Sequence, residues 1–254
     1  MPSAKDLFIR PIAAAPARAF VRKHHYSGKT ASNSQLHLGV FWQDRLEGVL
    51  QFGPSIDKRR LLGMVPGTPW HGMLELNRMV FTDRLPRNSE SRALAVALRL
   101  IRREYPQVQW IVSFADACQC GDGTIYRAAG FLLTAIRKNT TLWRLPSGEV
   151  VADITYSPGS TLKGSSAPAI PKLRALGAKR VEGFQIRYIY FLDPAARERL
   201  AAEVLPYSAI QEAGAGMYRG ELRAKGQDGE RPSPLGGSTP TRALHTSGAR
   251  GKTP

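Results

Sequence analysis

The chain has few cysteines, no long apolar run and few acidic residues for its length. Its two cysteines, Cys118 and Cys120, lie one residue apart, whereas metal-binding pairs are usually two residues apart and need a second pair. A zinc site is therefore not expected, and the thiols suit a reducing compartment, the cytoplasm. No apolar stretch approaches the roughly 20 residues of a membrane helix, so no membrane association is expected.

The shortage of acidic residues leaves a large positive charge. The 254 residues include 36 Lys and Arg but 20 Asp and Glu, a formal net charge of +16. Basic residues number 10 against 4 acidic in residues 1–60, and 11 against 6 in residues 61–146. A basic surface can simply be solvated, but Lys and Arg also gain affinity for nucleic acid by displacing counterions from phosphates. Nucleic acid is the favoured partner.

Apolar patterning predicts one α+β domain over residues 1–206. The expected strands are 7–12, 36–42, 46–52, 74–81, 110–116, 131–145 and 185–192, and the expected helices are 16–23, 92–105, one from about 124, and 194–205. Residues 146–183 are rich in Gly, Ser and Pro and are predicted to form an irregular insertion before the last strand. Residues 207–254 have almost no apolar periodicity and are predicted to be a disordered basic tail.

A basic turn precedes the helix expected from Arg92. The turn spans residues 84–91 and contains Arg87 and Ser91. Unpaired N–H groups and the dipole at a helix N-terminus favour an anion. The turn therefore predicts a place for the phosphate of a nucleotide-like cofactor, beside a site that contains Asp116 and Tyr126.

The order of the expected elements resembles the GNAT-type acyltransferase fold. The resemblance implies αβα layers, with a mixed, largely antiparallel central sheet flanked by helices, and an acyl-CoA-like donor. Such proteins bind the donor's pyrophosphate through a turn that contains glycine. Residues 84–91 contain no glycine, so the side chains of Arg87, Ser91 and Arg92 are expected to replace backbone donors.

Five motifs resemble the bacteriophage Mom family of DNA adenine-modification proteins. They are His24–Ser27, Glu75–Phe81, Asn88–Leu94, Ser113–Asp116 and Gly123–Tyr126, in the same order. The resemblance implies transfer of a carbamoylmethyl group to N6 of adenine in double-stranded DNA in the host cytoplasm, which blocks host restriction enzymes. The site residues that it implies are His25, Tyr26, Arg78, Ser91, Asp116 and Tyr126.

Adenine chemistry suggests roles for these residues. The N6 amine is a weak nucleophile inside the base stack, so the target adenine must be flipped out and lose a proton. Asp116 or His25 is expected to be the base, and Tyr126 the proton donor, with Tyr26 in the same catalytic group. Arg78 is expected to bind an anionic part of the cofactor or a DNA phosphate.

Trp70, Arg59 and Arg60 are the expected DNA contacts outside this group. Trp70 could stack on a base or fill the gap that the flipped base leaves. A divalent metal between His25 and Asp116 is a weaker hypothesis, because only two ligands are evident.

Each site residue also has a structural explanation. Tyr126 could be a core tyrosine, Asp116 or Ser91 a helix cap, His25 a histidine at a helix C-terminus, and Arg78 a solvent-facing strand residue. Two other classes of function stay open. They are a GNAT-type N-acetyltransferase acting on a protein or small amine, and a non-catalytic basic DNA-binding protein.

Overall fold

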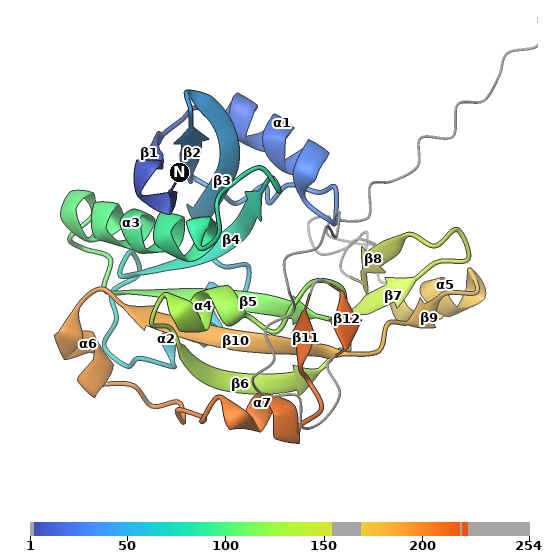
Figure 1. Cartoon of the computed structure of the whole chain (residues 1–254). Coiled ribbons are helices and arrows are strands. Elements are labelled where there is room, and N and C mark those ends of the chain that lie inside the picture. The colour runs from blue at the N-terminus through green and yellow to red at the C-terminus, as the bar shows by residue number, and fades with distance from the viewer. Residues whose placement is uncertain (1–2, 154–168, 219, 223–254) are drawn as a thin grey trace, which may run out of the picture.

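The structure is a computed structural model of the 254-residue chain that describes residues 3–153, 169–218 and 220–222. Its main element is a seven-stranded sheet in the order β1-β2-β3-β4-β5-β10-β6 (Figure 1). The strands are β1 (Phe8–Pro11), β2 (Leu36–Trp42), β3 (Arg45–Gly53), β4 (Met73–Phe81), β5 (Trp110–Ala117), β6 (Leu132–Lys138) and β10 (Phe184–Phe191). All neighbours pair antiparallel except β4 and β5, which pair parallel. The expected mixed, largely antiparallel sheet is confirmed.

Helices cover both faces of this sheet. They are η1 (Ala4–Asp6), α1 (Ala14–His24), α2 (Lys58–Leu62), α3 (Ser89–Glu104), α4 (Thr124–Ala128) and α6 (Pro194–Glu198). On one face, α3 and α4 pack on the largest core cluster, and on the other α1 packs near β3 while α2 and α6 pack near β5 and β10. The expected α+β class with helix, sheet and helix layers is confirmed.

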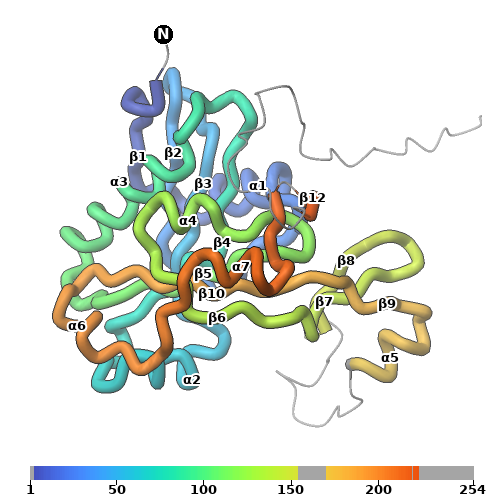
Figure 2. The backbone as a smooth tube through the Cα atoms, turned by 60° about the horizontal axis from the view of Figure 1, so that its bottom comes forward, coloured from blue at the N-terminus to red at the C-terminus, as the bar shows by residue number. Residues whose placement is uncertain are grey.

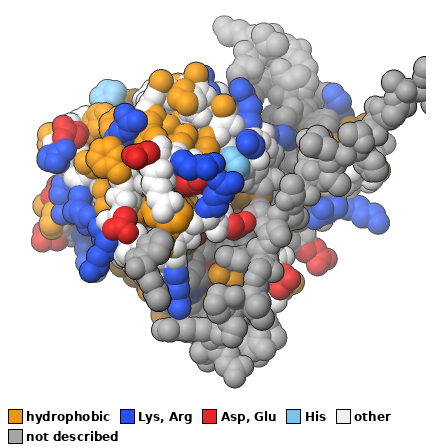
Figure 3. Space-filling model, turned by 45° about the horizontal axis from the view of Figure 1, so that its top comes forward, with side chains coloured by type: hydrophobic (Ala, Val, Ile, Leu, Met, Phe, Trp, Pro, Cys, Tyr) orange, Lys and Arg blue, Asp and Glu red, His pale blue; other side chains and the backbone are white. Residues whose placement is uncertain are grey.

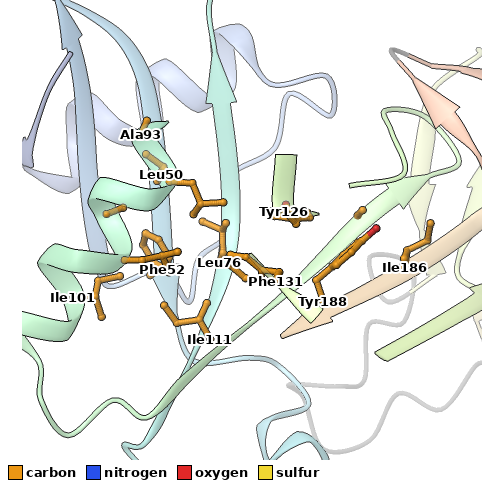
Figure 4. Packing of buried hydrophobic residues seen from close by; sticks show 14 of the residues in the cluster. Leu50, Phe52, Leu76, Ala93, Ile101, Ile111, Tyr126, Phe131, Ile186 and Tyr188 are labelled. Atoms are coloured by element: carbon orange, nitrogen blue, oxygen red, sulfur yellow. The ribbon is translucent and has the colours of Figure 1, made fainter. Parts of the chain in front are cut away.

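Helix α3 shows why the sequence folds in this way. Its buried residues Ala93, Leu94, Ala97, Leu98 and Ile101 recur with helical spacing and form one apolar face. That face packs on residues of β3, β4 and β5, as Figure 4 shows for part of the cluster. The helix begins at Ser89, three residues before the predicted start.

The region after β6 forms a small second sheet. Strands β7 (Leu142–Arg144), β8 (Val150–Ala152) and β9 (Lys179–Arg180) pair in the order β8-β7-β9, next to helix α5 (Ala169–Ala175). Trp143, Val151, Leu173 and Ala178 form its own core. This unit projects from one end of the main sheet (Figures 1 and 2). The prediction of an irregular insertion at 146–183 is wrong for its described part, and residues 154–168 lie outside the description.

The predicted domain end near residue 206 is also wrong. Helix α7 (Ser208–Glu212) and strands β11 (Met217–Tyr218) and β12 (Glu221–Leu222) follow it. Ile210, Ala215 and Met217 are buried in the main core. These three apolar residues pack this segment against the domain. They show no helical or strand periodicity, so the apolar pattern of the sequence did not predict that the segment is folded. The rest of the predicted tail, residues 223–254, lies outside the described residues.

Two smaller corrections concern helices. The predicted loop between residues 53 and 72 contains α2, and the last predicted helix is shorter, because α6 ends at Glu198. No helix in the described part of the chain is long and apolar enough to cross a membrane.

Candidate functional site

The candidate site lies where the two parallel strands separate. Strand β4 pairs with β5 only over Met73–Glu75 and Trp110–Val112. Both strands continue beyond this pairing, to Phe81 and Ala117. The two strands therefore separate in the middle of the sheet. We call the place between their unpaired parts the opening, and most of the predicted catalytic residues lie on or near these two strands.

A β-bulge in β4 sets the directions of two side chains at this opening. Two consecutive residues of β3 pair with Leu76 and Arg78, so Asn77 is an extra residue. A bulge of this kind reverses the alternation of side chains beyond it. As a result, Glu75 and Arg78 lie on the same face of the sheet, the face that carries α1.

Asp116, near the end of β5, is the centre of the site. One carboxylate oxygen accepts hydrogen bonds from the Tyr26 hydroxyl and the Gln119 amide, both at 3.0 Å. The other accepts from the Cys118 backbone N–H at 3.0 Å and the Gln185 amide at 3.1 Å. Asp116 does not cap α4, whose N-cap is Gly123. Four donors hold this carboxylate in one orientation as an anion.

Tyr26 joins the loop after α1 to this carboxylate. Its side chain is 42% exposed, but its hydroxyl end is directed at Asp116. Burial of the hydroxyl and the adjacent negative charge of Asp116 raise the pKa of Tyr26 well above its usual value. Tyr26 is therefore a neutral hydroxyl that can donate a proton or hydrogen bond, but is not a base near neutral pH.

His25 stacks against Tyr26, with ring centroids 4.2 Å apart. Its Nδ1 accepts the Ser27 backbone N–H at 3.2 Å and lies 2.8 Å from the Ser27 hydroxyl, which assigns the ring proton to Nε2. Burial and the positive charge of Arg78 lower the pKa of His25 to about 3. His25 is therefore neutral near pH 7 and is not a protonated histidine that stabilises the C-terminus of α1. Its ring is also a weak base.

Arg78 is tethered and does not simply face solvent. Its Nε donates to the Lys29 carbonyl oxygen at 3.1 Å, and its Nη1 donates to the Asn77 carbonyl oxygen at 2.6 Å. The guanidinium thus connects the bulge of β4 with the loop that carries His25 and Tyr26. Its charge also acts on both of those side chains.

Glu75 is a site residue that the sequence reasoning missed. Burial raises the pKa of this carboxyl, opposed by the nearby Ser55 and Asn77 side chains and by Arg78. A carboxylate with a raised pKa is a stronger base than one held by several donors. An acidic residue among the apolar residues at the start of the strand was the only signal in the sequence, and strict alternation places it on the face opposite Arg78.

Tyr126 reaches the site from the other helix layer. It is 8% exposed and packs against Phe131 and Tyr188, with ring centroids 5.5 and 5.3 Å away (Figure 4). Burial raises its pKa to about 12, and the Ser113 hydroxyl and Arg78 oppose that shift while Glu75 adds to it. Tyr126 is thus both a core residue and a protonated hydroxyl close to the charged groups of the site.

A metal at this site finds no support. Among the described residues, no group of three or more His, Cys, Asp or Glu side chains is placed to hold a metal ion. The Nδ1 of His25 and both carboxylate oxygens of Asp116 already form hydrogen bonds. Cys118 is buried, and burial with the adjacent Asp116 raises its pKa to about 12, so its thiol stays protonated.

The predicted cofactor residues other than Arg78 lie at the start of α3. Arg87, Ser91 and Arg92 line a groove of about 670 Å³ together with Lys5 and Arg99, and no acidic side chain lines it. The buried Nε of Arg92 has no hydrogen-bond partner among the described residues. This groove fits an anionic group. Ser91 is not the helix cap, because Asn88 occupies that position with a φ of 67°.

The predicted DNA contacts lie on the opposite face, at α2. Arg59 and Arg60 are exposed on this helix. Trp70 is 54% exposed, and the Lys58 ammonium lies 4.9 Å from its ring centroid. A larger hollow of about 910 Å³ lies at the edge of β1 and β2, and none of the predicted site residues lines it.

Comparison with known proteins gives the family. The Mom protein family matches residues 6–209. Methylcarbamoylase mom of Escherichia phage Mu is 38% identical over 207 residues, which cover 80% of this chain and 84% of the phage protein.

Solved structures give only a distant likeness. The ribosomal-protein-S18-alanine N-acetyltransferase of Escherichia coli is 9% identical, with a TM-score of 0.41 over 74% of this chain and 94% of that one. A GNAT family acetyltransferase of Elizabethkingia anophelis with acetyl-CoA bound is 11% identical, with a TM-score of 0.37 over 73% and 98%. The extent of the family match and the identity to the phage protein confirm the resemblance seen in the motifs, and the chain belongs to the Mom protein family.

Proposed function

We propose that this chain is a DNA-modifying transferase that adds a carbamoylmethyl group to N6 of adenine and so protects DNA from restriction enzymes. The observation that supports this most is the cluster of Tyr26, Glu75, Arg78, Asp116 and Tyr126 at the separated strands of a Mom family chain. The cluster combines the protonated hydroxyls of Tyr26 and Tyr126 with two carboxyl groups. Asp116 is hydrogen-bonded, and the pKa of Glu75 is raised. A protein that only binds DNA has no need of such groups.

The proton chemistry assigns different roles from those expected from sequence. The adenine N6 amine loses a proton as its nitrogen bonds to carbon, and Glu75 is the carboxylate best suited to accept it, because burial raises its pKa. Both carboxylate oxygens of Asp116 are already occupied by four hydrogen-bond donors, and His25 is a weak base because its pKa is lowered to about 3. We assign to Asp116 the positioning of Tyr26.

The hydroxyls of the two tyrosines in the cluster then serve as donors of a hydrogen bond or a proton. Tyr26 and Tyr126 have raised pKa values, so each retains its proton near neutral pH. A neutral hydroxyl can hydrogen-bond a ring nitrogen of the flipped adenine or protonate a leaving group. Arg78 keeps the loop that carries Tyr26 against the bulge.

The donor of the transferred group is proposed to be acyl-CoA-like. The groove at α3 would hold its phosphates through Arg87, Ser91 and Arg92, and the unpartnered Nε of Arg92 supplies a donor for them. When bound, such a donor supplies the two-carbon unit in activated form. The groove lies on the α3 side of the sheet, and Glu75 and Arg78 face the α1 side, so donor and DNA are proposed to approach from opposite faces.

The charge of the chain supports DNA as the substrate. Lys and Arg exceed Asp and Glu by 16 in the sequence. On the face in Figure 3, Lys and Arg side chains are spread over much of the described surface. Such a surface attracts phosphates over a wide area.

The test is protection of plasmid DNA in cells that express the chain. Plasmid from cells with the wild-type chain is expected to resist restriction enzymes whose recognition sequences contain adenine, and plasmid from Glu75→Gln cells to be cut. Glu104→Gln is the matched control, because Glu104 is an exposed glutamate at the end of α3. Full cutting with the wild-type chain, despite its expression, would contradict the proposal.

A further inference from the structure

Part of the sheet face that carries α1 and α2 is uncovered beside Asp116. On this face Asp116 pairs with Gln185, which pairs on its other side with Arg137. The next row is Phe114 paired with Arg187. We call these five residues the open strip. The row after it contains Val112 and Ile189, which are buried under α2 and α6. No described helix covers the open strip itself.

The open strip contains two arginines beside the acidic Asp116. Arg137 is exposed, and Arg187 donates to the hydroxyl and carbonyl oxygens of Thr134 at 3.0 and 3.1 Å. Within the described residues, neither arginine forms a salt bridge. Burial lowers the pKa of Arg187, and Arg137 and Arg60 of α2 are close enough to lower it further. Arg60 has an acidic partner, since its Nη1 lies 3.9 Å from an Asp57 carboxylate oxygen. An anion bound here would chiefly relieve the repulsion between Arg137 and Arg187.

An aromatic side chain lies within this charged surface. Phe114 is 39% exposed on a central strand, where the neighbouring apolar residues of β5 are buried. It is two residues before Asp116, and its strand partner is Arg187. An exposed aromatic ring between guanidinium groups is the combination that binds a nucleic-acid strand, with bases stacked on the ring and phosphates on the arginines.

We propose that the open strip binds the DNA strand that carries the target adenine, with a neighbouring base stacked on Phe114 and its phosphates on Arg60, Arg137 and Arg187. This inference rests on the proposed function and deepens it. The strip begins at Asp116, so a strand lying along it delivers one nucleotide to the opening between β4 and β5. Because stacking and phosphate contacts tolerate any base, the strip holds the strand without reading its sequence.

The test measures affinity for a short DNA duplex with one unpaired adenine, which lowers the cost of flipping the base. The double variant Arg60→Gln and Arg137→Gln removes two exposed charges. Its affinity is expected to fall roughly tenfold, and the slope of log affinity against log salt to decrease by about 1.8, since each phosphate contact contributes about 0.9. The control is Arg102→Gln with Arg103→Gln, an equal charge change at the exposed end of α3.

Phe114→Leu provides an independent measurement. It keeps an apolar side chain but removes the ring, so affinity is expected to fall with no change in the salt slope. The inference is overturned if the arginine double variant binds like its control, or if the wild-type chain does not bind this DNA.

The modified adenine produced in cells is measured separately. If it is present while the double variant binds like its control, this inference fails and the proposed function stands. If it is absent while the double variant loses affinity, the strip is supported and the proposed chemistry fails.

Discussion

The Tyr26 hydroxyl donates a 3.0 Å hydrogen bond to the carboxylate of Asp116, which is 90 residues further along the chain. This contact connects the loop after α1 with β5, two parts of the chain on either side of the opening in the sheet. Gln119, Gln185 and the Cys118 N–H fix the acceptor. The hydroxyl is therefore directed by a carboxylate that has little freedom to move.

Replacing Tyr26 by Phe is expected to reduce adenine modification strongly while the free energy of unfolding changes little. The side chain is partly exposed, so loss of one hydrogen bond should cost at most about 1 kcal/mol of unfolding free energy. Adenine modification should fall by roughly 100-fold or more, because a proton donor is removed. Thermal melting and nucleoside analysis measure the two effects. Tyr105→Phe, at an exposed tyrosine after α3, is the control. Near wild-type modification by Tyr26→Phe would make Tyr26 a structural residue.

Glu75→Gln is expected to abolish most of the activity without weakening the fold. General base catalysis contributes roughly 10²–10⁴-fold in rate, and the amide cannot accept the proton. DNA affinity should be unchanged, because no charge on the open strip is altered. A variant that still modifies adenine at more than about a tenth of the wild-type rate would remove Glu75 from the mechanism.

The pH dependence of stability tests Glu75 separately. Its pKa in the folded chain is above the usual 4.5, so the folded state holds the proton more tightly than the unfolded state. The wild-type chain should therefore lose stability as pH rises from 4.5 through the raised pKa. Glu75→Gln should lack this loss and become the more stable of the two at neutral pH. Equal pH dependence of the two chains by denaturant unfolding would refute the raised pKa.

His25 is expected to remain neutral over the whole working range. Because its pKa is lowered to about 3, its imidazole signals in NMR should not move between about pH 5 and 8. The unfolded chain takes up the proton near 6.5, so this residue makes the fold less stable as pH falls from 6.5 toward 3. His25→Gln assigns the signals by their loss. A His25 titration near pH 6.5 would contradict the lowered pKa and reopen His25 as a candidate base.

Truncation measures the contribution of α7 and β11. A chain that ends at Pro206 loses the buried Ile210 and Met217 side chains, each stabilising by roughly 1.5–3 kcal/mol when fully buried. It also loses the bond from the Asp122 N–H to the Met217 carbonyl oxygen. Its melting temperature should be well below that of a chain that ends at Leu222. Equal melting temperatures of the two chains would instead support the domain end predicted near residue 206.

The sequence predicted the strands of the site better than the directions of their side chains. Alternation of apolar residues located β4 and β5, since half-buried strands have a period of two. It could not locate the bulge at Asn77, because the bulge is defined by the pairing of β4 with β3, a long-range contact that the residues of β4 alone do not specify. Glu75 therefore seemed to face away from Arg78, and its role was missed.

Long-range contacts explain the other differences. Gln185 is the second residue of β10 and has no local signal, but pairing with β5 brings it to Asp116. In the sequence, Phe114 cannot be told from the buried apolar residues of the strand. It is exposed because α2 packs over the next row of the sheet, at Val112 and Ile189, and not over Phe114. His25, Tyr26, Asp116 and Tyr126 could be predicted as candidates because motifs identify residues independently of their burial.

Mass spectrometry of nucleosides from DNA of cells that express the wild-type chain tests the central claim most directly. We predict a deoxyadenosine heavier by one carbamoylmethyl group in place of a hydrogen, present with the wild-type chain and strongly reduced with Glu75→Gln and Tyr26→Phe. Acetylated protein or small amines with unmodified deoxyadenosine would instead support an N-acetyltransferase. Unmodified DNA from cells that contain the folded wild-type chain would contradict the account.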